Sequence, residues 1–154
     1  MVTMDFYTRL VYARKTPVIG RFFYYCLKLL GSEIPVSVPI GPDFILEHGG
    51  HGVVIHSKAI IGSGVHIYQG VTIGRADIYL PGSQSRFEGI EIGDDVILSP
   101  GSKILCKEGI LKVGNRSVIG ANAVLLQSTG EDEIWAGSPA RCIGKRPPMK
   151  DQPA

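Results

Sequence analysis

Large aliphatic residues recur every six positions along much of the chain. In residues 53–74 they are Ile55, Ile61, Ile67 and Ile73, and the first three are followed four places later by Ala59, Val65 and Val71. A period of six is neither the 3.6-residue period of a helix nor the alternation of a two-sided strand. It is typical of a parallel β-helix, in which each short strand sends one large side chain inward before the chain turns a corner. The pattern therefore predicts an all-β solenoid.

The same phase returns in three further segments, which extends the predicted solenoid over residues 33–146. Its inward positions there are Ile34, Ile40, Leu46, Ile92, Leu98, Ile104, Val113, Ile119 and Leu125. Twenty glycines suit a chain with many tight corners, because glycine adopts positive φ without a Cβ clash. We expect residues 1–32 to form a helical segment and residues 147–154 a flexible tail.

Residues 3–30 are predicted to be helical, with a break near Thr16 and Pro17. Threonine is a suitable N-cap, proline suits the first turn of a helix, and Gly31 suits a helix stop. The second helix is rich in aromatic residues. Its apolar face is expected to pack on the coil or on a neighbouring subunit; the alternative is an amphipathic helix on a membrane surface, near a lipid-linked substrate.

Two interruptions of the repeat are candidates for function, because departures from a regular scaffold are commonly functional loops. Residues 47–54, EHGGHGVV, hold two histidines, a glutamate and three glycines. Residues 75–89 form a longer excursion, predicted to protrude as an arm or wall over a site on an adjacent subunit, or else to be an idle surface loop. Its Arg75 and Arg86 are candidate substrate-binding residues.

Composition excludes several classes of protein. The chain has 154 residues, 44% of them hydrophobic, which suits one domain with its own core. A net charge of +2 is too small to indicate nucleic-acid binding. Three cysteines without a C-x-x-C pair predict neither a disulfide framework nor a metal site, and favour a reducing cytoplasm. The sequence shows neither the pattern of a secretory signal nor an uncharged apolar run of about 20 residues. We therefore predict a cytoplasmic protein, with the inner face of the membrane as an alternative location.

Three sequence segments carry a resemblance to a known family. They are EIPVSVPIGPDFILEH at 33–48, GVTIG at 70–74 and AGSPARCIGK at 136–145. Together with the hexapeptide repeats they resemble the serine acetyltransferase-like branch of the left-handed β-helix acyltransferases, over roughly residues 33–146. The resemblance implies a left-handed coil, a homotrimer with active sites between neighbouring coils, and acetyl-CoA as the acyl donor.

The resemblance places the catalytic histidine at His48, after Glu47, and its partner carboxylate fifteen residues upstream at Glu33. A hydroxyl needs a base to remove its proton as it attacks a thioester, and imidazole suits that task. A carboxylate would orient the ring. His51 is the rival base, since the chain has one extra residue after His48, and with Glu47 it is a candidate acceptor-binding residue. His56 and His66 are expected to be structural.

The resemblance also implies a groove for coenzyme A lined by small residues. Its candidates are Ser99, Gly101, Gly120, Ala121, Ala136 and Gly137, with Arg141 and Lys145 for the nucleotide phosphates. Pro100 lacks an N–H, so Ser99 or Gly101 is expected to supply the hydrogen bond to the oxyanion. The histidine spacing does not match the three-histidine zinc site of proteins resembling γ-carbonic anhydrases, and no metal is expected.

Gly89 stands where serine acetyltransferases have a second histidine that helps to hold the amino acid. Their large helical N-terminal domain is replaced here by the short segment 3–30. Both differences predict a sugar or glycan hydroxyl as acceptor, as in the O-acetyltransferases of exopolysaccharide synthesis. Two alternatives stay open: serine acetylation in cysteine biosynthesis, and a non-catalytic trimeric β-helix scaffold.

Overall fold

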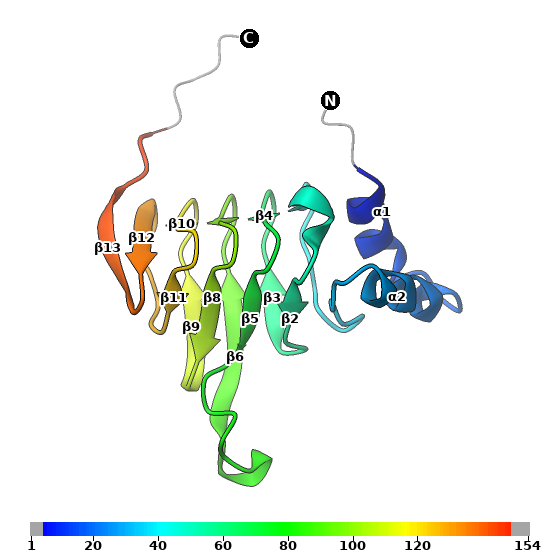
Figure 1. Ribbon diagram of the computed structural model, residues 1–154, viewed down its shortest axis with the longest axis horizontal. Helices are drawn as coiled ribbons and strands as arrows, with labels where there is room; N and C mark the ends of the chain where they lie inside the picture. The colour runs from blue at the N-terminus through cyan, green and yellow to red at the C-terminus, as the bar shows by residue number, and fades with distance from the viewer. Residues whose placement is uncertain (1–4, 149–154) are drawn as a thin grey trace.

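The computed structural model describes residues 5–148, most of which form three stacks of short, mostly parallel strands (Figure 1). The first sheet contains β1 (Ile45–Leu46), β4 (His66–Ile67), β7 (Ile97–Leu98), β10 (Val118–Ile119), β12 (Glu133–Gly137) and β13 (Ala140–Lys145). The second contains β2 (Val54–Ile55), β5 (Thr72–Arg75), β8 (Lys103–Cys106) and β11 (Val124–Leu125). The third contains β3 (Ala59–Ile61), β6 (Arg86–Ile92) and β9 (Glu108–Val113).

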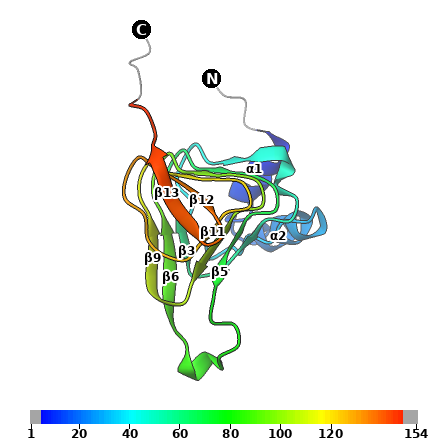
Figure 2. The same cartoon turned by 60° about the vertical axis from the view of Figure 1, so that its left-hand side comes forward.

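Successive strands join the three sheets in rotation, so that each turn of the chain lies on the turn before it (Figure 2). The rotation ends at β12, which follows β11 but joins the first sheet instead of the third, and β13 then folds back antiparallel to β12 at the C-terminal end. In-register parallel pairing places equivalent residues of successive turns directly side by side. Leu46, for example, pairs with Ile67, which pairs in turn with Leu98.

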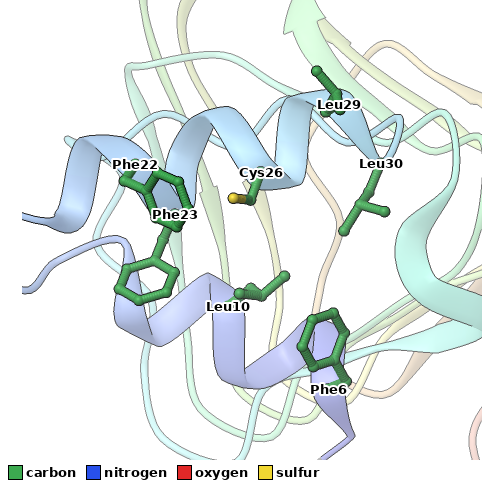
Figure 3. A pocket seen from close by; sticks show the side chains of 7 residues that line it. All are labelled: Phe6, Leu10, Phe22, Phe23, Cys26, Leu29 and Leu30. Carbon is green, nitrogen blue, oxygen red and sulfur yellow. The ribbon is translucent and has the colours of Figure 1, made fainter.

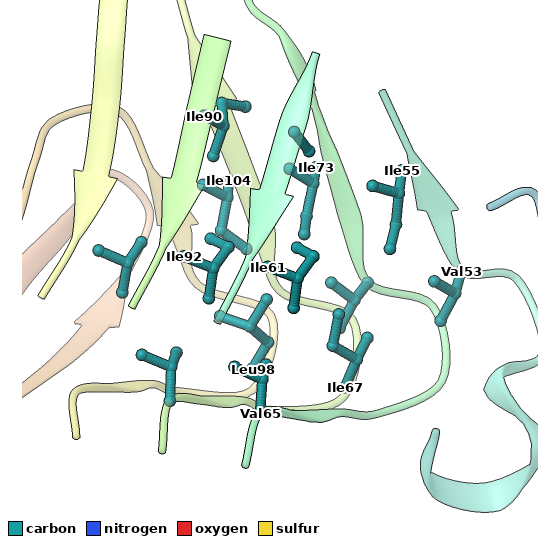
Figure 4. Close-up of a cluster of buried hydrophobic side chains, with 14 of the residues drawn as sticks. Val53, Ile55, Ile61, Val65, Ile67, Ile73, Ile90, Ile92, Leu98 and Ile104 are labelled. Carbon is teal, nitrogen blue, oxygen red and sulfur yellow. The ribbon is translucent and has the colours of Figure 1, made fainter. Parts of the chain in front are cut away.

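The residues of the six-residue period form the core, as the sequence predicted. Figure 4 shows several of them pointing into the space enclosed by the sheets. All of the predicted inward positions are buried except Ile40, which is partly buried against the core. Stacked aliphatic side chains removed from water in this way supply the main driving force for such a fold.

Glycine is needed where successive turns pass a corner most closely. A Cβ at Gly62 would lie 2.7 Å from the carbonyl carbon of Gly93 on the next turn. A Cβ at Gly114 would lie 2.3 Å from the carbonyl oxygen of Gly130. These distances are too short for any side chain, so the stacking distance itself requires glycine at both positions.

Two helices cover the N-terminal end of the coil (Figure 1). Helix α1 (Phe6–Ala13) is capped by the Asp5 carboxylate, which accepts a hydrogen bond from the Thr8 N–H at 2.7 Å. Helix α2 (Gly20–Leu29) begins after Ile19 without a side-chain cap. The predicted N-cap at Thr16 and helix start at Pro17 were therefore wrong, because both residues lie in the turn between the helices.

Gly31 ends helix α2, and Arg14 attaches the two helices to the coil. Gly31 has a φ of 90°, which confirms the predicted helix stop. Arg14 is fully buried and donates hydrogen bonds to the carbonyl oxygens of Val11, Pro35 and Val38. Burial lowers the pKa of this guanidinium to about 10. Arg14 thus joins the helices to the first turn of the coil.

The long interruption protrudes beyond the sheets between β5 and β6 (Figures 1 and 2). It is shorter than the predicted 75–89, since β5 extends to Arg75 and β6 already begins at Arg86. Residues 76–85, including the short helix η2 (Gly82–Gln84), form the protruding loop. Of the predicted flexible tail, residues 149–154 lie outside the described residues.

Candidate active site

The first interruption folds into a short kinked helix, η1 (Glu47–Gly50), beside α1. His48 has φ 51° and ψ 33°, and Gly49 has φ 71° and ψ 5°, so two consecutive residues are left-handed. The left-handed conformation is energetically costly for a residue with a side chain such as His48, so packing by neighbouring residues has to stabilise it. Tyr7 supplies such packing: its ring lies so close to Gly49 that a Cβ there would be 2.9 Å away. The result is an exposed histidine at a sharp bend.

Two side chains of the following turn face the residues of this bend. The ring of Tyr68 lies 5.9 Å from the ring of His48, centroid to centroid, at an interplanar angle of 52°. Nδ1 of His66 lies 2.9 Å from Oε1 of Glu47. Glu47 is thus turned toward β4, and His48 keeps an exposed ring beside Tyr68.

His51, the rival base, is bound to the N-terminal helices. Its Nδ1 lies 3.1 Å from the carbonyl oxygen of Leu30, at the end of α2. A carbonyl oxygen can only accept, so Nδ1 must carry the proton in this contact. The edge of the ring also contacts Tyr7, with centroids 6.0 Å apart. These contacts give His51 a structural task and favour His48 as the base.

Glu33 lies at the start of the coil, fifteen residues before His48, and its N–H donates to the carbonyl oxygen of Val53 at 2.8 Å. Its carboxylate has Lys28 as its ion-pair partner, with Oε1 and Nζ 3.3 Å apart. The structure therefore gives Glu33 a partner on α2 rather than His48. A catalytic pair of Glu33 and His48 stays a prediction.

Strand register gathers the bend and most of the predicted coenzyme-binding residues along one edge. The inward residues Leu46, Ile67, Leu98, Ile119 and Trp135 pair in register in the first sheet, so the residues that directly follow them lie in one row. We call this row, together with His48, the histidine edge; its other members are Glu47, Tyr68, Ser99, Gly120 and Ala136. Ala121 and Gly137 come next in the chain and are exposed. The side chains of the last three members, Ser99, Gly120 and Ala136, are small and partly buried.

The backbone N–H groups of Ser99 and Gly101, which were predicted to stabilise the oxyanion, already donate hydrogen bonds within the coil. The N–H of Ser99 donates to the carbonyl oxygen of Ile119 at 2.9 Å, and that of Gly101 donates to Gln69 at the same distance. Both bonds belong to the ladder that joins successive turns. The expectation that Ser99 or Gly101 supplies a free donor is therefore not met in this structure.

The two predicted phosphate-binding residues lie at opposite ends of β13, which pairs with β12. Arg141 pairs with Ala136, at the histidine edge, whereas Lys145 pairs with Glu133 at the other end of the strand. Arg141 is exposed, and its guanidinium donates to the carbonyl oxygen of Ala140 at 3.0 Å. Lys145 instead lines a surface cavity of about 490 Å³, together with Arg116, Asp132, Arg146 and Pro148. The register thus brings only Arg141 to the candidate site.

Arg75 and Arg86 stand at the two ends of the protruding loop. Nε of Arg75 lies 2.7 Å from Oδ1 of Asp77, and the Ser85 hydroxyl donates to Oδ2 of Asp77 at 2.6 Å. These bonds, from Arg75 first and Ser85 second, lower the pKa of the Asp77 carboxyl, whose side chain is almost fully buried. Arg86 is exposed, 3.5 Å from Glu108. Arg75 therefore holds the base of the loop through Asp77. The exposed side chain of Arg86 is not part of that contact and lies near Glu108.

The contact between His66 and Glu47 was missed from the sequence. Its signal was the position of His66 directly before the inward Ile67, which corresponds to Ile45 before Leu46 on the preceding turn. That equivalence places His66 on the outer face, one strand away from the interrupted repeat. Tyr68 was missed for the same reason, since it follows Ile67 at the corner that Glu47 occupies one turn earlier.

The fold and its open edge define a hexapeptide-repeat protein with a mostly parallel three-sheet architecture. No protein-family model matches the chain. Among curated relatives, it is 37% identical over 135 residues to a serine acetyltransferase of Staphylococcus epidermidis. It is 36% identical over 133 residues to a serine acetyltransferase of Staphylococcus aureus. These matches cover 88% and 86% of this chain but 56% and 55% of the relatives, so the chain spans about half of their length.

Solved structures of serine acetyltransferases also resemble this chain. Serine acetyltransferase of Brucella abortus in complex with coenzyme A matches 93% of this chain and 55% of its own, with a TM-score of 0.71 and 26% identity. Serine acetyltransferase of Neisseria gonorrhoeae in complex with serine matches 90% of this chain and 55% of its own, with a TM-score of 0.72. At 21% identity the latter likeness concerns the fold alone. The chain is therefore similar to serine acetyltransferases over most of its length.

The predicted sugar or glycan acceptor was wrong, because the relatives at 36–37% identity are serine acetyltransferases and not enzymes of polysaccharide synthesis. One of the two differences behind that prediction was Gly89. A Cβ at this position would lie 2.9 Å from the carbonyl oxygen of Lys58, the residue just before β3. Packing against β3 therefore dictates glycine there, and its missing side chain carries no information about the acceptor.

Proposed function

We propose that this chain is an acetyl-CoA-dependent serine O-acetyltransferase of the serine acetyltransferase family, with His48 as its general base. The observation that carries the proposal is 37% identity to a serine acetyltransferase across 88% of the chain. The geometry supports it, since an exposed histidine lies at the end of a row of small residues. A long acyl donor and a small hydroxyl acceptor can meet at such an edge.

The proposed reaction needs one base and one acid. The serine hydroxyl oxygen attacks the thioester carbonyl carbon while His48 takes the hydroxyl proton. Collapse of the tetrahedral intermediate breaks the carbon–sulfur bond and leaves O-acetylserine. The imidazolium of His48 returns its proton to the departing thiolate, so coenzyme A leaves as a free thiol. Imidazole suits both steps, because its ordinary pKa of about 6.5 lies near neutral pH.

Coenzyme A is proposed to lie along the histidine edge as the donor substrate. Gly120 and Ala136 present almost no side chain there, so the pantetheine arm could approach the backbone closely. Support comes from Brucella abortus serine acetyltransferase, which has been solved with coenzyme A. Arg141, exposed on β13 where it pairs with Ala136, is the proposed contact for the nucleotide phosphates.

The acceptor end of the site is proposed to include Glu47, whose carboxylate can bind the ammonium group of serine. Glu33 is proposed to act on the ring of His48 after breaking its exposed ion pair with Lys28. We also propose a left-handed coil and a homotrimer in which a neighbouring coil completes the groove. In that assembly the loop 76–85 and Arg86 reach toward the neighbouring subunit.

The test is acetyl-CoA turnover by the whole chain, followed by thiol release, with serine, threonine and a panel of sugars as acceptors. Serine is expected to give the highest kcat/KM, and O-acetylserine is expected as the product by mass spectrometry. Turnover with a sugar but not with serine would overturn the proposal. Binding of acetyl-CoA, measured separately by calorimetry, distinguishes a wrong acceptor from a wrong donor. A chain that neither binds nor consumes acetyl-CoA would instead be a non-catalytic scaffold.

A further inference from the structure

Helix α2 presents an apolar stripe to solvent on the side away from the coil. Gly20 and Leu27 are buried and face the coil. With 3.6 residues per turn, the opposite side of the helix carries Phe22, Tyr25 and Leu29. These side chains are 66%, 62% and 93% exposed. Large apolar side chains grouped on one exposed face usually mark an interaction surface.

The stripe continues into an apolar groove between the two helices (Figure 3). The groove has a volume of about 420 Å³, and its lining is almost entirely apolar. Figure 3 shows side chains of both helices lining the opening, among them Phe6, Leu10, Phe22, Phe23 and Cys26. Phe6, at the mouth, is 64% exposed. The apolar surface thus spans α1 and α2 rather than a single helix.

Basic side chains predominate around this surface, although one of them, Lys28, is paired with Glu33 at 3.3 Å. Between Asp5 and Glu33 the sequence contains no acidic residue and five basic ones, Arg9, Arg14, Lys15, Arg21 and Lys28. All but the buried Arg14 are exposed. Arg21 and Lys28 are seven residues apart, so they lie on one side of α2 and border the stripe of Phe22, Tyr25 and Leu29. An apolar face bordered by cations is typical of helices that lie in a membrane interface.

We propose that α1 and α2 dock the protein onto an anionic phospholipid surface. In the docked state Phe22, Tyr25 and Leu29 enter the boundary between headgroups and acyl chains, and Arg21 contacts lipid phosphates. Among the described residues, no helix is long and apolar enough to span a membrane, so the contact is peripheral. The inference concerns a surface separate from the histidine edge and goes beyond the proposed reaction.

Charge distinguishes this partner from a second copy of the chain. Two copies joined through this face would bring their basic side chains together, and the acidic residues at its limits are already engaged, Asp5 as the cap of α1 and Glu33 with Lys28. Like charges brought together in an interface are costly. An anionic membrane instead supplies the opposite charge over the whole surface.

The experiment is flotation of the full chain with vesicles of phosphatidylcholine alone, or with about 30% phosphatidylglycerol, at low and high salt. The variants are Phe22→Gln with Leu29→Gln, which remove the stripe, and Arg21→Gln, which removes one bordering charge. Matched controls are Ile78→Gln, at an apolar residue 81% exposed on the protruding loop, and Lys107→Gln, at an exposed lysine near β9. Circular dichroism checks that each variant is folded.

Wild type is expected to float with anionic vesicles only, and to be released at about 0.5 M salt. Removing the stripe should weaken partitioning at least tenfold and Arg21→Gln about fivefold. The two controls should bind as wild type does. The proposal is overturned if wild type fails to float, floats equally with neutral vesicles, or keeps its partitioning in the stripe variant. Concentration-dependent dimerisation abolished by Leu29→Gln, without vesicle binding, would assign the surface to a second copy instead.

Discussion

Nδ1 of His66 lies 2.9 Å from Oε1 of Glu47, on the neighbouring turn of the coil. Glu47 directly precedes His48 in η1, whereas His66 belongs to β4, which pairs with β1. The contact therefore fastens the left-handed bend to a regular strand. Both side chains are partly exposed, so its own contribution to stability is small. Its value lies in fixing the position of the residue next to the proposed base.

This contact makes the effects of two substitutions interdependent. His66→Ala is expected to lower kcat for acetyl transfer several-fold, because Glu47 loses its partner and the bend its anchor. Glu47→Gln should lower it as well, and the double variant should be less impaired than the sum of the two. If Glu47 also binds serine, Glu47→Gln alone will raise the KM for serine. Additive effects of the two substitutions on kcat would show that the contact has no role.

His48, in η1, and His51, at the end of η1, are expected to differ in their contribution to catalysis. His48→Ala should lower kcat by about 10²–10⁴, because the hydroxyl then lacks its base. His51→Ala serves as the matched control. It should change kcat less than about threefold while destabilising the fold modestly, since it loses the contact with Leu30. Steady-state kinetics and thermal unfolding of both variants are the measurements, and a greater loss of kcat in His51→Ala would reverse the assignment.

The protruding loop is expected to loosen in acid. The pKa of Asp77 is lowered by Arg75 and Ser85, so its stabilising effect is complete above the ordinary pKa of an aspartate and is lost as pH falls below it. Amide hydrogen exchange of residues 76–85, corrected for the intrinsic rate, should stay constant from about pH 7 to 5 and rise below about pH 4. Asp77→Asn should raise exchange already at neutral pH. Glu88→Gln, at an exposed carboxylate of β6, should not.

Neighbouring isoleucines of β3 provide a test of the core. Ile61 is 2% exposed and Ile60 is 49% exposed. Ile61→Ala is expected to lower the free energy of unfolding by about 2–5 kcal/mol, because it leaves a cavity between turns. Ile60→Ala should change it by about 0.5 kcal/mol or less. Denaturant unfolding at one fixed protein concentration is the measurement, and equal losses in the two variants would contradict the inward phase of the repeat.

Prediction from sequence was most reliable where the structure repeats itself. Each inward residue is set by its place in a six-residue unit, so Ile55, Ile61 and Ile67 could be assigned without knowing which turns touch. Gly31 could be assigned too, since a helix stop is a local event. Prediction failed at Thr16, where two local signals for a helix start were overridden by the buried Arg14, whose hydrogen bonds fix the turn between the helices.

By itself the sequence determined the period of the coil, its core, and the histidine at the break, because these depend on residues near one another along the chain. Only the tertiary structure decided that Glu47 contacts His66, that Arg141 and not Lys145 reaches the histidine edge, and that Gly89 is dictated by Lys58. Each of these depends on which residues of different turns become neighbours. That register is set by the packing of the whole coil and is not encoded in any single repeat.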